Sequence, residues 1–222
     1  SRLAALISDV QSQPVKLVNS GIGANVISTR SPGYEGSGKP AAVERLGKHV
    51  IAHDPDLLVV SYGLNDARSG TPLALFAEEL GGVVDRVRGS CDPVIVLLGP
   101  YFMTDFSCGG APWSHGSVEL FHAFNDLISA VARAKGCLFV GLLKAYGGAP
   151  WMVHQDGVHA NDLSHLVVAN KIFEVLARNC SGLAKHTKAA EHDIPPWRDE
   201  SVLAADYGHK RDASPPPGSE EP

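Results

Sequence analysis

Short apolar runs alternate with amphipathic segments along most of the chain. Four runs rich in β-branched residues predict strands at about 15–18, 57–61, 94–98 and 137–142. Apolar positions three and four residues apart predict helices at about 40–52, from Thr71, from Ser117 and at about 162–178. The opening residues keep the same spacing, so the chain is expected to begin within a helix, with apolar positions at Leu3, Leu6, Ile7 and Val10.

This alternation favours an α/β fold. Strands that are apolar throughout, each separated from the next by a helix, indicate a mostly parallel sheet covered by helices on both faces. A chain of 222 residues with this pattern has no room for eight strand–helix units of a barrel. The pattern therefore predicts a three-layer α/β/α domain with an open, doubly wound sheet of the flavodoxin-like kind.

The periodic pattern ends near residue 182. Residues 195–222 contain six prolines of the chain's 15 and show neither helical nor strand spacing. Such a segment cannot bury enough apolar surface to offset the entropy of ordering it. The sequence thus predicts one domain over residues 1–182 and a disordered, proline-rich tail over residues 183–222.

Charge and composition narrow the classes of partner. The chain has 19 basic and 24 acidic side chains, a net charge of −5 and no basic stripe, which argues against nucleic acid binding. Its apolar runs are far shorter than the roughly 20 residues needed to cross a bilayer, so no membrane span is expected. The four cysteines form no Cys-x-x-Cys pair, and His49 and His53 lack a third ligand nearby, so neither a metal nor another cofactor is predicted.

Three polar clusters follow or flank the predicted strands and helices. Gly21-Ile22-Gly23-Ala24 comes after the strand at 15–18, and Gly63-Leu64-Asn65-Asp66 comes after the strand at 57–61. Asp156 and His159 lie just ahead of the last predicted helix. Ligands collect at the carboxyl ends of strands in a parallel sheet, so we expect the three clusters to meet at one edge of the sheet.

The acid and histidine suit general base catalysis. Asp156 can hold one ring nitrogen of His159 while the other nitrogen faces a substrate. A helix cap next to a surface histidine would give the same spacing, and that alternative stays open for the motif alone.

The other two clusters, Gly63–Asp66 and the glycine-rich loop Gly21–Ala24, suit the binding of a developing negative charge. Gly63 allows a tight turn, the Asn65 amide can donate to an oxyanion, and Asp66 is expected to cap the turn through backbone amides. An ordinary Asn-Asp turn is the alternative. The glycine-rich loop could aim backbone N–H groups at an anion, but it lacks the third glycine of a dinucleotide fingerprint and the Gly-Lys-Ser/Thr of a P-loop.

Together and in this order, the clusters resemble the blocks of the SGNH hydrolases, also called the GDSL lipase/esterase family. The resemblance spans roughly residues 1–180, with Gly63-Leu64-Asn65-Asp66 matching the third block and Asp156-Gly157-Val158-His159 the last. It implies that Asn65 donates to the oxyanion, that His159 is the base and that Asp156 orients it. In the second block Ala24 stands where the family usually has its glycine; its backbone N–H is retained, and Gly23 is the rival donor.

The first block of that family has no counterpart in the chain. No Gly-Asp-Ser motif is present, and neither Ser8, Ser20 nor Ser61 lies in a comparable setting. The resemblance implies that the family's first strand, which carries the nucleophilic serine, is missing and that the chain is a fragment. The family's sheet order places that strand between the second and third strands.

The resemblance implies a serine esterase that cleaves a carboxylic ester of an acylated carbohydrate or a lipid, with no nucleophile in this chain. The alternative is a catalytically inactive SGNH-like module that binds carbohydrate or acts as a scaffold. A set of loop aromatics either walls a substrate groove or packs the loops, namely Trp113, Trp151, Tyr101, Phe102 and Phe106. The oligomeric state and the cell compartment are left open.

Overall fold

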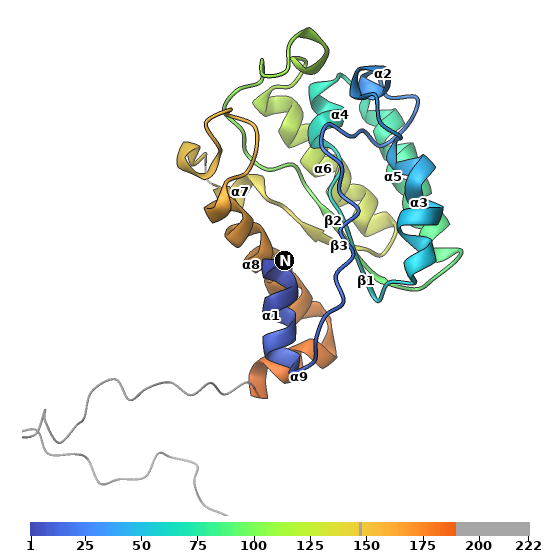
Figure 1. Cartoon of the computed structure of the whole chain (residues 1–222), viewed down its shortest axis with the longest axis vertical. Coiled ribbons are helices and arrows are strands. Elements are labelled where there is room, and N and C mark those ends of the chain that lie inside the picture. Colours follow the sequence, from blue (N-terminus) through green and yellow to red (C-terminus); the bar gives the residue numbers. More distant parts are fainter. Residues whose placement is uncertain (147, 190–222) are drawn as a thin grey trace, which may run out of the picture. The chain divides into compact units, whose positions relative to one another are not determined.

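The computed structural model describes residues 1–146 and 148–189, and Ser1–Lys188 form one compact unit. Its sheet has the parallel order β1-β2-β3, made of β1 (Leu57–Val60), β2 (Val94–Leu98) and β3 (Leu138–Val140) (Figure 1). The strands predicted at 57–61, 94–98 and 137–142 are confirmed, each with slightly different ends.

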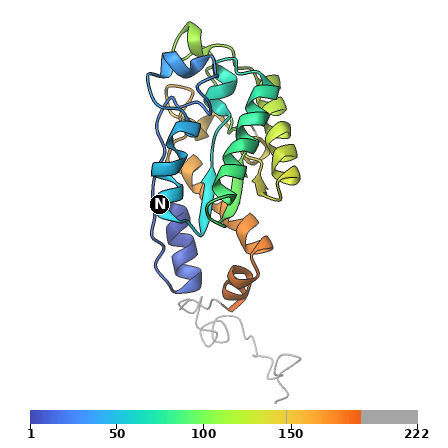
Figure 2. The same cartoon turned by 90° about the vertical axis from the view of Figure 1, so that its right-hand side faces the viewer.

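Successive residues of the central strand are buried in opposite cores. Ile95 and Leu97 pack in a core covered by α3 (Ala42–His49), α5 (Leu73–Arg88) and α6 (Val118–Ala134). Val96 and Leu98 pack in a second core covered by α1 (Arg2–Gln11) and α8 (Asp162–Asn179). The fold is therefore the predicted three-layer α/β/α arrangement, with helices on both faces of a parallel sheet (Figures 1 and 2).

The helices begin close to the predicted residues because polar side chains cap them. The Ser117 hydroxyl accepts a hydrogen bond from the Leu120 N–H at the start of α6, at 3.1 Å. The Asn161 side-chain oxygen accepts one from the Ser164 N–H at the start of α8, also at 3.1 Å. Shorter elements complete the unit: α2 (Gly33–Ser37), α4 (Leu64–Arg68), α7 (Leu143–Tyr146), α9 (Ser181–Ala189) and 3₁₀ turns at Ile51–His53, Ala111–Trp113 and Pro150–Met152.

The prediction of a strand at 15–18 is wrong. This segment leads away from α1 but pairs with no strand in the described part of the chain. Leu17 and Val18 are 52% and 42% exposed. A β-branched run becomes a strand only where a neighbouring backbone takes up its N–H and C=O groups, and here none does. One consequence is that β1 is an edge strand.

The predicted tail is helical where it begins. Residues 183–189 belong to α9, and Leu183 packs against the second core, so burial of an apolar side chain overrides the low periodicity there. The remainder of the predicted tail lies outside the described residues.

Two further findings bear on the sequence-based expectations. All four cysteines, at 91, 108, 137 and 180, are half-buried free thiols. Among the helices that the structure describes, none combines the length and the apolar character that a membrane span requires.

Candidate active site

Asp156 and His159 lie in the loop between the 3₁₀ turn Pro150–Met152 and α8. The Asp156 Oδ2 atom is 2.6 Å from Nδ1 of His159. Asp156 Oδ1 accepts hydrogen bonds from the backbone N–H groups of Val158 and His159, each at 2.9 Å. Hydrogen bonds from the His159 backbone and ring and from the Val158 backbone hold the pKa of the Asp156 carboxyl well below its usual range. The carboxylate thus stays ionised and keeps Nδ1 turned toward itself, which leaves Nε2 for proton transfer.

The loop that carries this pair is clamped to the segment after β2. Gly157 has φ +70°, and its carbonyl oxygen accepts hydrogen bonds from the N–H groups of Thr104, at 2.7 Å, and Asp105, at 3.1 Å. A Cβ on Gly157 would lie 2.6 Å from the Cβ of Asp105. Only glycine fits this close approach, so the position of the Asp156–His159 loop depends on residue 157.

Gly63 forms the tight turn between β1 and α4. Its φ is +113°, and a Cβ there would come within 3.1 Å of Ile128 Cδ1 and 3.3 Å of Phe76 Cζ. The left-handed backbone and the lack of space both require glycine. The turn therefore places α4, and with it Asn65, directly beyond the carboxyl end of β1.

Asp66 is fully buried and joins this turn to a neighbouring loop. Its carboxylate accepts hydrogen bonds from the backbone N–H groups of Gly63, at 3.2 Å, and Ile27, at 3.0 Å, and from the Ser31 hydroxyl, at 3.2 Å. Burial raises the pKa of Asp66 to about 6, although these hydrogen bonds oppose the rise. With no exposed surface, Asp66 supports the turn and cannot touch a substrate.

The amide of Asn65 is fixed at both ends. Its Nδ2 donates to the Asn25 carbonyl oxygen at 3.2 Å, and its Oδ1 accepts from Arg68 Nη1 at 3.5 Å. A guanidinium only donates and a carbonyl only accepts, so the two neighbours determine which end of the amide is which. The second N–H of Nδ2 is then the one that can serve a ligand.

The loop of Gly23 and Ala24 adjoins Asn65 through Asn25. Both residues are exposed, and their N–H groups have no acceptor among the described residues. Ala24 adopts φ +54°, a left-handed conformation that is uncommon for alanine. The buried Asn25 anchors the loop, since its Oδ1 accepts from the Tyr62 hydroxyl at 2.6 Å. The loop thus holds two available backbone donors beside the Asn65 amide.

A chain of hydrogen bonds connects Asn65 with the Asp156–His159 loop. Arg68, which contacts Asn65, also donates to the Cys108 carbonyl through Nη2. The Cys108 N–H donates to Asp105 Oδ1 at 3.2 Å, and the Asp105 N–H donates to the Gly157 carbonyl. The segments after β1, β2 and β3 therefore contact one another at the carboxyl edge of the sheet, the upper end in Figure 1.

Two residues of this connection, Arg68 and Asp105, were not predicted from the sequence. Arg68 lies three residues after Asn65 on the same short helix, and that spacing could have identified it. The contact of Asp105 with Gly157 joins segments far apart in the chain, and no local pattern predicts it.

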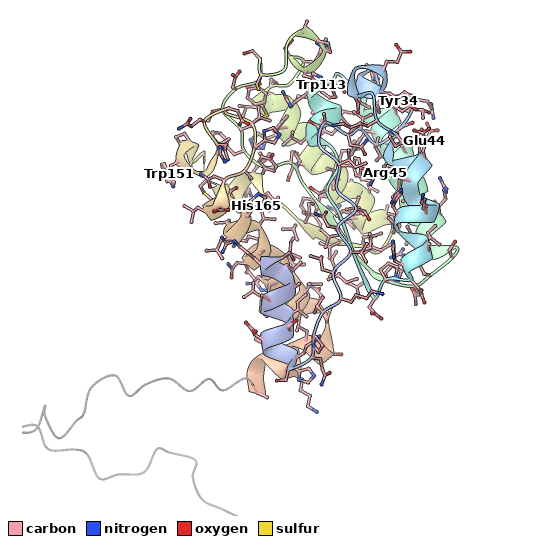
Figure 3. All side chains as sticks on the ribbon, viewed as in Figure 1. Tyr34, Glu44, Arg45, Trp113, Trp151 and His165 are labelled. Carbon is pink, nitrogen blue, oxygen red and sulfur yellow. The ribbon has the colours of Figure 1, made fainter. Side chains whose placement is uncertain are left out.

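The other candidate side chains have identifiable roles. Ser20 and Ser8 use their hydroxyls on backbone groups: Ser20 donates to the His49 carbonyl at 2.6 Å, and Ser8 accepts from the Val15 N–H at 3.0 Å. Trp113 is only 9% exposed and packs under the Arg68 guanidinium, which lies 6.0 Å from its ring centre. Trp151, by contrast, is 70% exposed (Figure 3). Within residues 1–146 and 148–189, no group of three or more His, Cys, Asp or Glu side chains is arranged to hold a metal ion.

Several solved structures share this fold. The acetylxylan esterase Axe2 from Geobacillus stearothermophilus matches with a TM-score of 0.59 and 17% identity, over 79% of this chain and 80% of that one. A lipase/acylhydrolase from Enterococcus faecalis matches with a TM-score of 0.50 and 20% identity, over 60% and 67% of the two chains. Catalytic mutants of Axe2 replace a serine, an aspartate and a histidine, the last two being three positions apart in that enzyme. No curated protein sequence matches the chain.

The sequence itself matches a family model over most of its length. The model of the GDSL-like lipase/acylhydrolase family covers residues 1–167. Gly63-Leu64-Asn65-Asp66 and Asp156-Gly157-Val158-His159 both fall within that range. The chain therefore belongs to the GDSL-like lipase/acylhydrolase family, the SGNH hydrolases.

Proposed function

We propose that this chain supplies the acid–base pair and the oxyanion donors of a serine esterase acting on a carboxylic ester of an acylated carbohydrate or a lipid. The observation that carries the proposal is the 2.6 Å contact between Asp156 Oδ2 and His159 Nδ1, with the carboxylate held by backbone N–H groups. Membership of a lipase/acylhydrolase family supports the reaction class. The same two residue types, at the same spacing, are the sites of catalytic mutants in Axe2.

In this mechanism His159 takes a proton from the nucleophilic serine as its oxygen attacks the acyl carbon. Asp156 keeps the ring in the Nδ1–H tautomer and offsets the charge of the imidazolium. The carbonyl oxygen becomes an oxyanion, which accepts hydrogen bonds from Asn65 Nδ2 and from the backbone N–H of Ala24 or Gly23. One such donor typically contributes about 3 kcal/mol to transition-state stabilisation. No metal or organic cofactor takes part.

The proton then returns to the leaving group. The imidazolium of His159 protonates the alcohol oxygen as the ester bond breaks, which leaves an acyl-serine. A water molecule, deprotonated by His159, attacks this second ester and releases the carboxylic acid and the free serine. Both half-reactions use the same donors for the oxyanion.

The nucleophile in this proposal is carried on a strand outside residues 1–222 that pairs with β1. The open edge of β1 and the half-buried state of Leu57, Leu58 and Val59 support a strand at this place. In the unpaired segment 15–18, Leu17 and Val18 are exposed. Their exposure supports a second contact of the same strand, made with this segment. A parallel strand added at this edge would end next to the turn that holds Asn65.

The proposal is tested on the protein extended upstream of Ser1 by its own coding sequence. Assays with p-nitrophenyl acetate and with longer acyl esters should show hydrolysis that stops after treatment with a serine-directed fluorophosphonate. An extended protein that is inert over the whole ester panel would contradict an esterase function. It would favour the alternative of an inactive carbohydrate-binding or scaffold module, which the missing Gly-Asp-Ser block motivates.

A further inference from the structure

An exposed tryptophan lies in the 3₁₀ turn Pro150–Met152, which leads into the loop of Asp156 and His159. The Trp151 side chain is 70% exposed, whereas tryptophan is usually highly buried in folded proteins. Its backbone is fixed, because its carbonyl accepts a hydrogen bond from Asn161 Nδ2 at 2.6 Å. The N-cap residue of α8 therefore fixes the main chain from which the indole projects. Nothing in the described fold covers the ring.

A hollow of about 520 Å³ is lined by the same Asn161. Its lining residues flank His159 in sequence and begin α8, namely His154, Ala160, Asn161, Asp162, Leu163 and His165. The His154 backbone N–H donates to the His159 carbonyl at 2.7 Å, so the hollow borders the catalytic loop itself. In Figure 3, Trp151 comes from the 3₁₀ turn Pro150–Met152 and His165 from the first turn of α8.

The polar side chains of this hollow are available to a ligand. His154, Asp162 and His165 are exposed, and their side chains have no hydrogen-bond or ion-pair partner within the described residues. Two imidazoles and a carboxylate offer both donors and acceptors. A lipid chain covering them would leave them unsatisfied, at a cost in free energy, whereas the hydroxyl groups of a sugar would pair with them.

We propose that Trp151 and the neighbouring hollow form a subsite for the pyranose rings of a carbohydrate ester. One face of a pyranose ring consists of C–H bonds, which suit the electron-rich face of an indole. The ring hydroxyls meet His154, Asp162 and His165. This proposal rests on the proposed esterase function, and it specifies the substrate as a carbohydrate ester rather than a lipid ester.

The test measures binding and needs no nucleophile. The chain of residues 1–222 is titrated with xylohexaose and with cellohexaose by isothermal titration calorimetry. At least one hexasaccharide should bind with a Kd below about 5 mM, and Trp151→Ala should weaken binding about tenfold or more. Trp151→Phe, which keeps an aromatic face, should stay within about threefold of the parent. Because Trp151 is exposed, the fold should survive both changes, as circular dichroism would verify.

Leu163→Ala is the matched control. Leu163 is also exposed, at 47%, and also lines the hollow, but it offers no ring face. Its loss should change the affinity less than about twofold. The subsite is overturned if neither sugar binds, if Trp151→Ala binds as well as the parent, or if Trp151 instead drives binding to phosphatidylcholine vesicles. Hydrolysis of p-nitrophenyl acetate by the extended protein would still support the esterase function in that event.

Discussion

Asp156 holds His159 at two points, the ring and the backbone. Its Oδ2 is 2.6 Å from the ring Nδ1, and its Oδ1 is 2.9 Å from the backbone nitrogen of the same histidine. The ring is therefore oriented relative to its own main chain by a single carboxylate. Such an arrangement fixes the direction of Nε2 without help from a distant segment, and it explains why an acid three residues before the histidine suffices.

Replacing Asp156 by Asn should change the tautomer of His159. The parent carboxylate accepts only, so neutral His159 carries its proton on Nδ1. An amide can turn its NH₂ group toward the ring and favour the Nε2–H form instead. Nitrogen-15 NMR of the ring should show the Nδ1–H tautomer in the parent and a large share of Nε2–H in Asp156→Asn. The exposed Asp162→Asn change, which lies outside this contact, is the control, and identical tautomers in all three proteins would contradict the assignment.

Asp66 should make stability fall as the pH rises from about 4 to about 6. Burial raises its pKa to about 6 in the folded state, whereas the unfolded chain releases the proton near pH 3.9. Between these values the folded state binds more protons, so the free energy of unfolding decreases with pH, by roughly 3 kcal/mol in total. Above about pH 6 the titration of Asp66 causes no further loss of stability.

The measurement compares the parent with Asp66→Asn by urea unfolding at pH 4, 5, 6 and 7. Asparagine does not titrate, so subtracting its curve removes the contributions of all other groups. The stability advantage of the parent should shrink steadily up to pH 6 and then stay level. A difference that is independent of pH would show that Asp66 is ionised at pH 4.

Gly63→Ala should destabilise the fold. The new Cβ would need a left-handed backbone at φ +113° and would press against Ile128 and Phe76. The expected loss is about 1–3 kcal/mol, measured as a lower denaturation midpoint with an unchanged slope. Gly82→Ala is the matched control: it lies within α5, nothing lies within 4 Å of its added Cβ, and it should be stabilising by about 0.5–1 kcal/mol. Equal effects at both glycines would refute the strain argument.

Ala24→Gly should stabilise the protein. Ala24 adopts φ +54°, which costs an alanine about 1 kcal/mol and a glycine almost nothing. Ala130→Gly, at an exposed position inside α6, should have the opposite sign and cost about 1 kcal/mol. Thermal unfolding of the two variants would measure both changes in stability. A loss of stability in Ala24→Gly would mean that the loop does not hold residue 24 in the left-handed region.

The layers of the fold could be predicted because its strands and helices have signals in the local sequence. The run 94–98 is apolar on both faces, and Ser117 and Asn161 cap helices through bonds to residues three positions on. The segment 15–18 has an equally good local pattern but is no strand, since pairing depends on a neighbour elsewhere in the chain. Local sequence cannot report that neighbour.

The candidate site likewise contains some contacts that local sequence predicts and others that it does not. The contact between Asp156 and His159 lies within one turn and could be predicted from spacing. The orientation of Asn65 depends on Asn25 and Arg68, and only the former is distant in sequence. The clamp of Asp105 on Gly157 and the exposure of Trp151 follow from how loops meet, which no periodicity encodes.

The most direct test of the account is the rate of p-nitrophenyl acetate hydrolysis by the protein extended upstream of Ser1, with and without His159. Residues 1–222 alone should be inert, and the extended protein should turn over. His159→Ala should reduce kcat by about a thousandfold or more, and Asn65→Ala by about a hundredfold or more. If His159→Ala hydrolyses the ester as fast as its parent, or if residues 1–222 do so faster than their own His159→Ala variant, the assigned machinery is wrong.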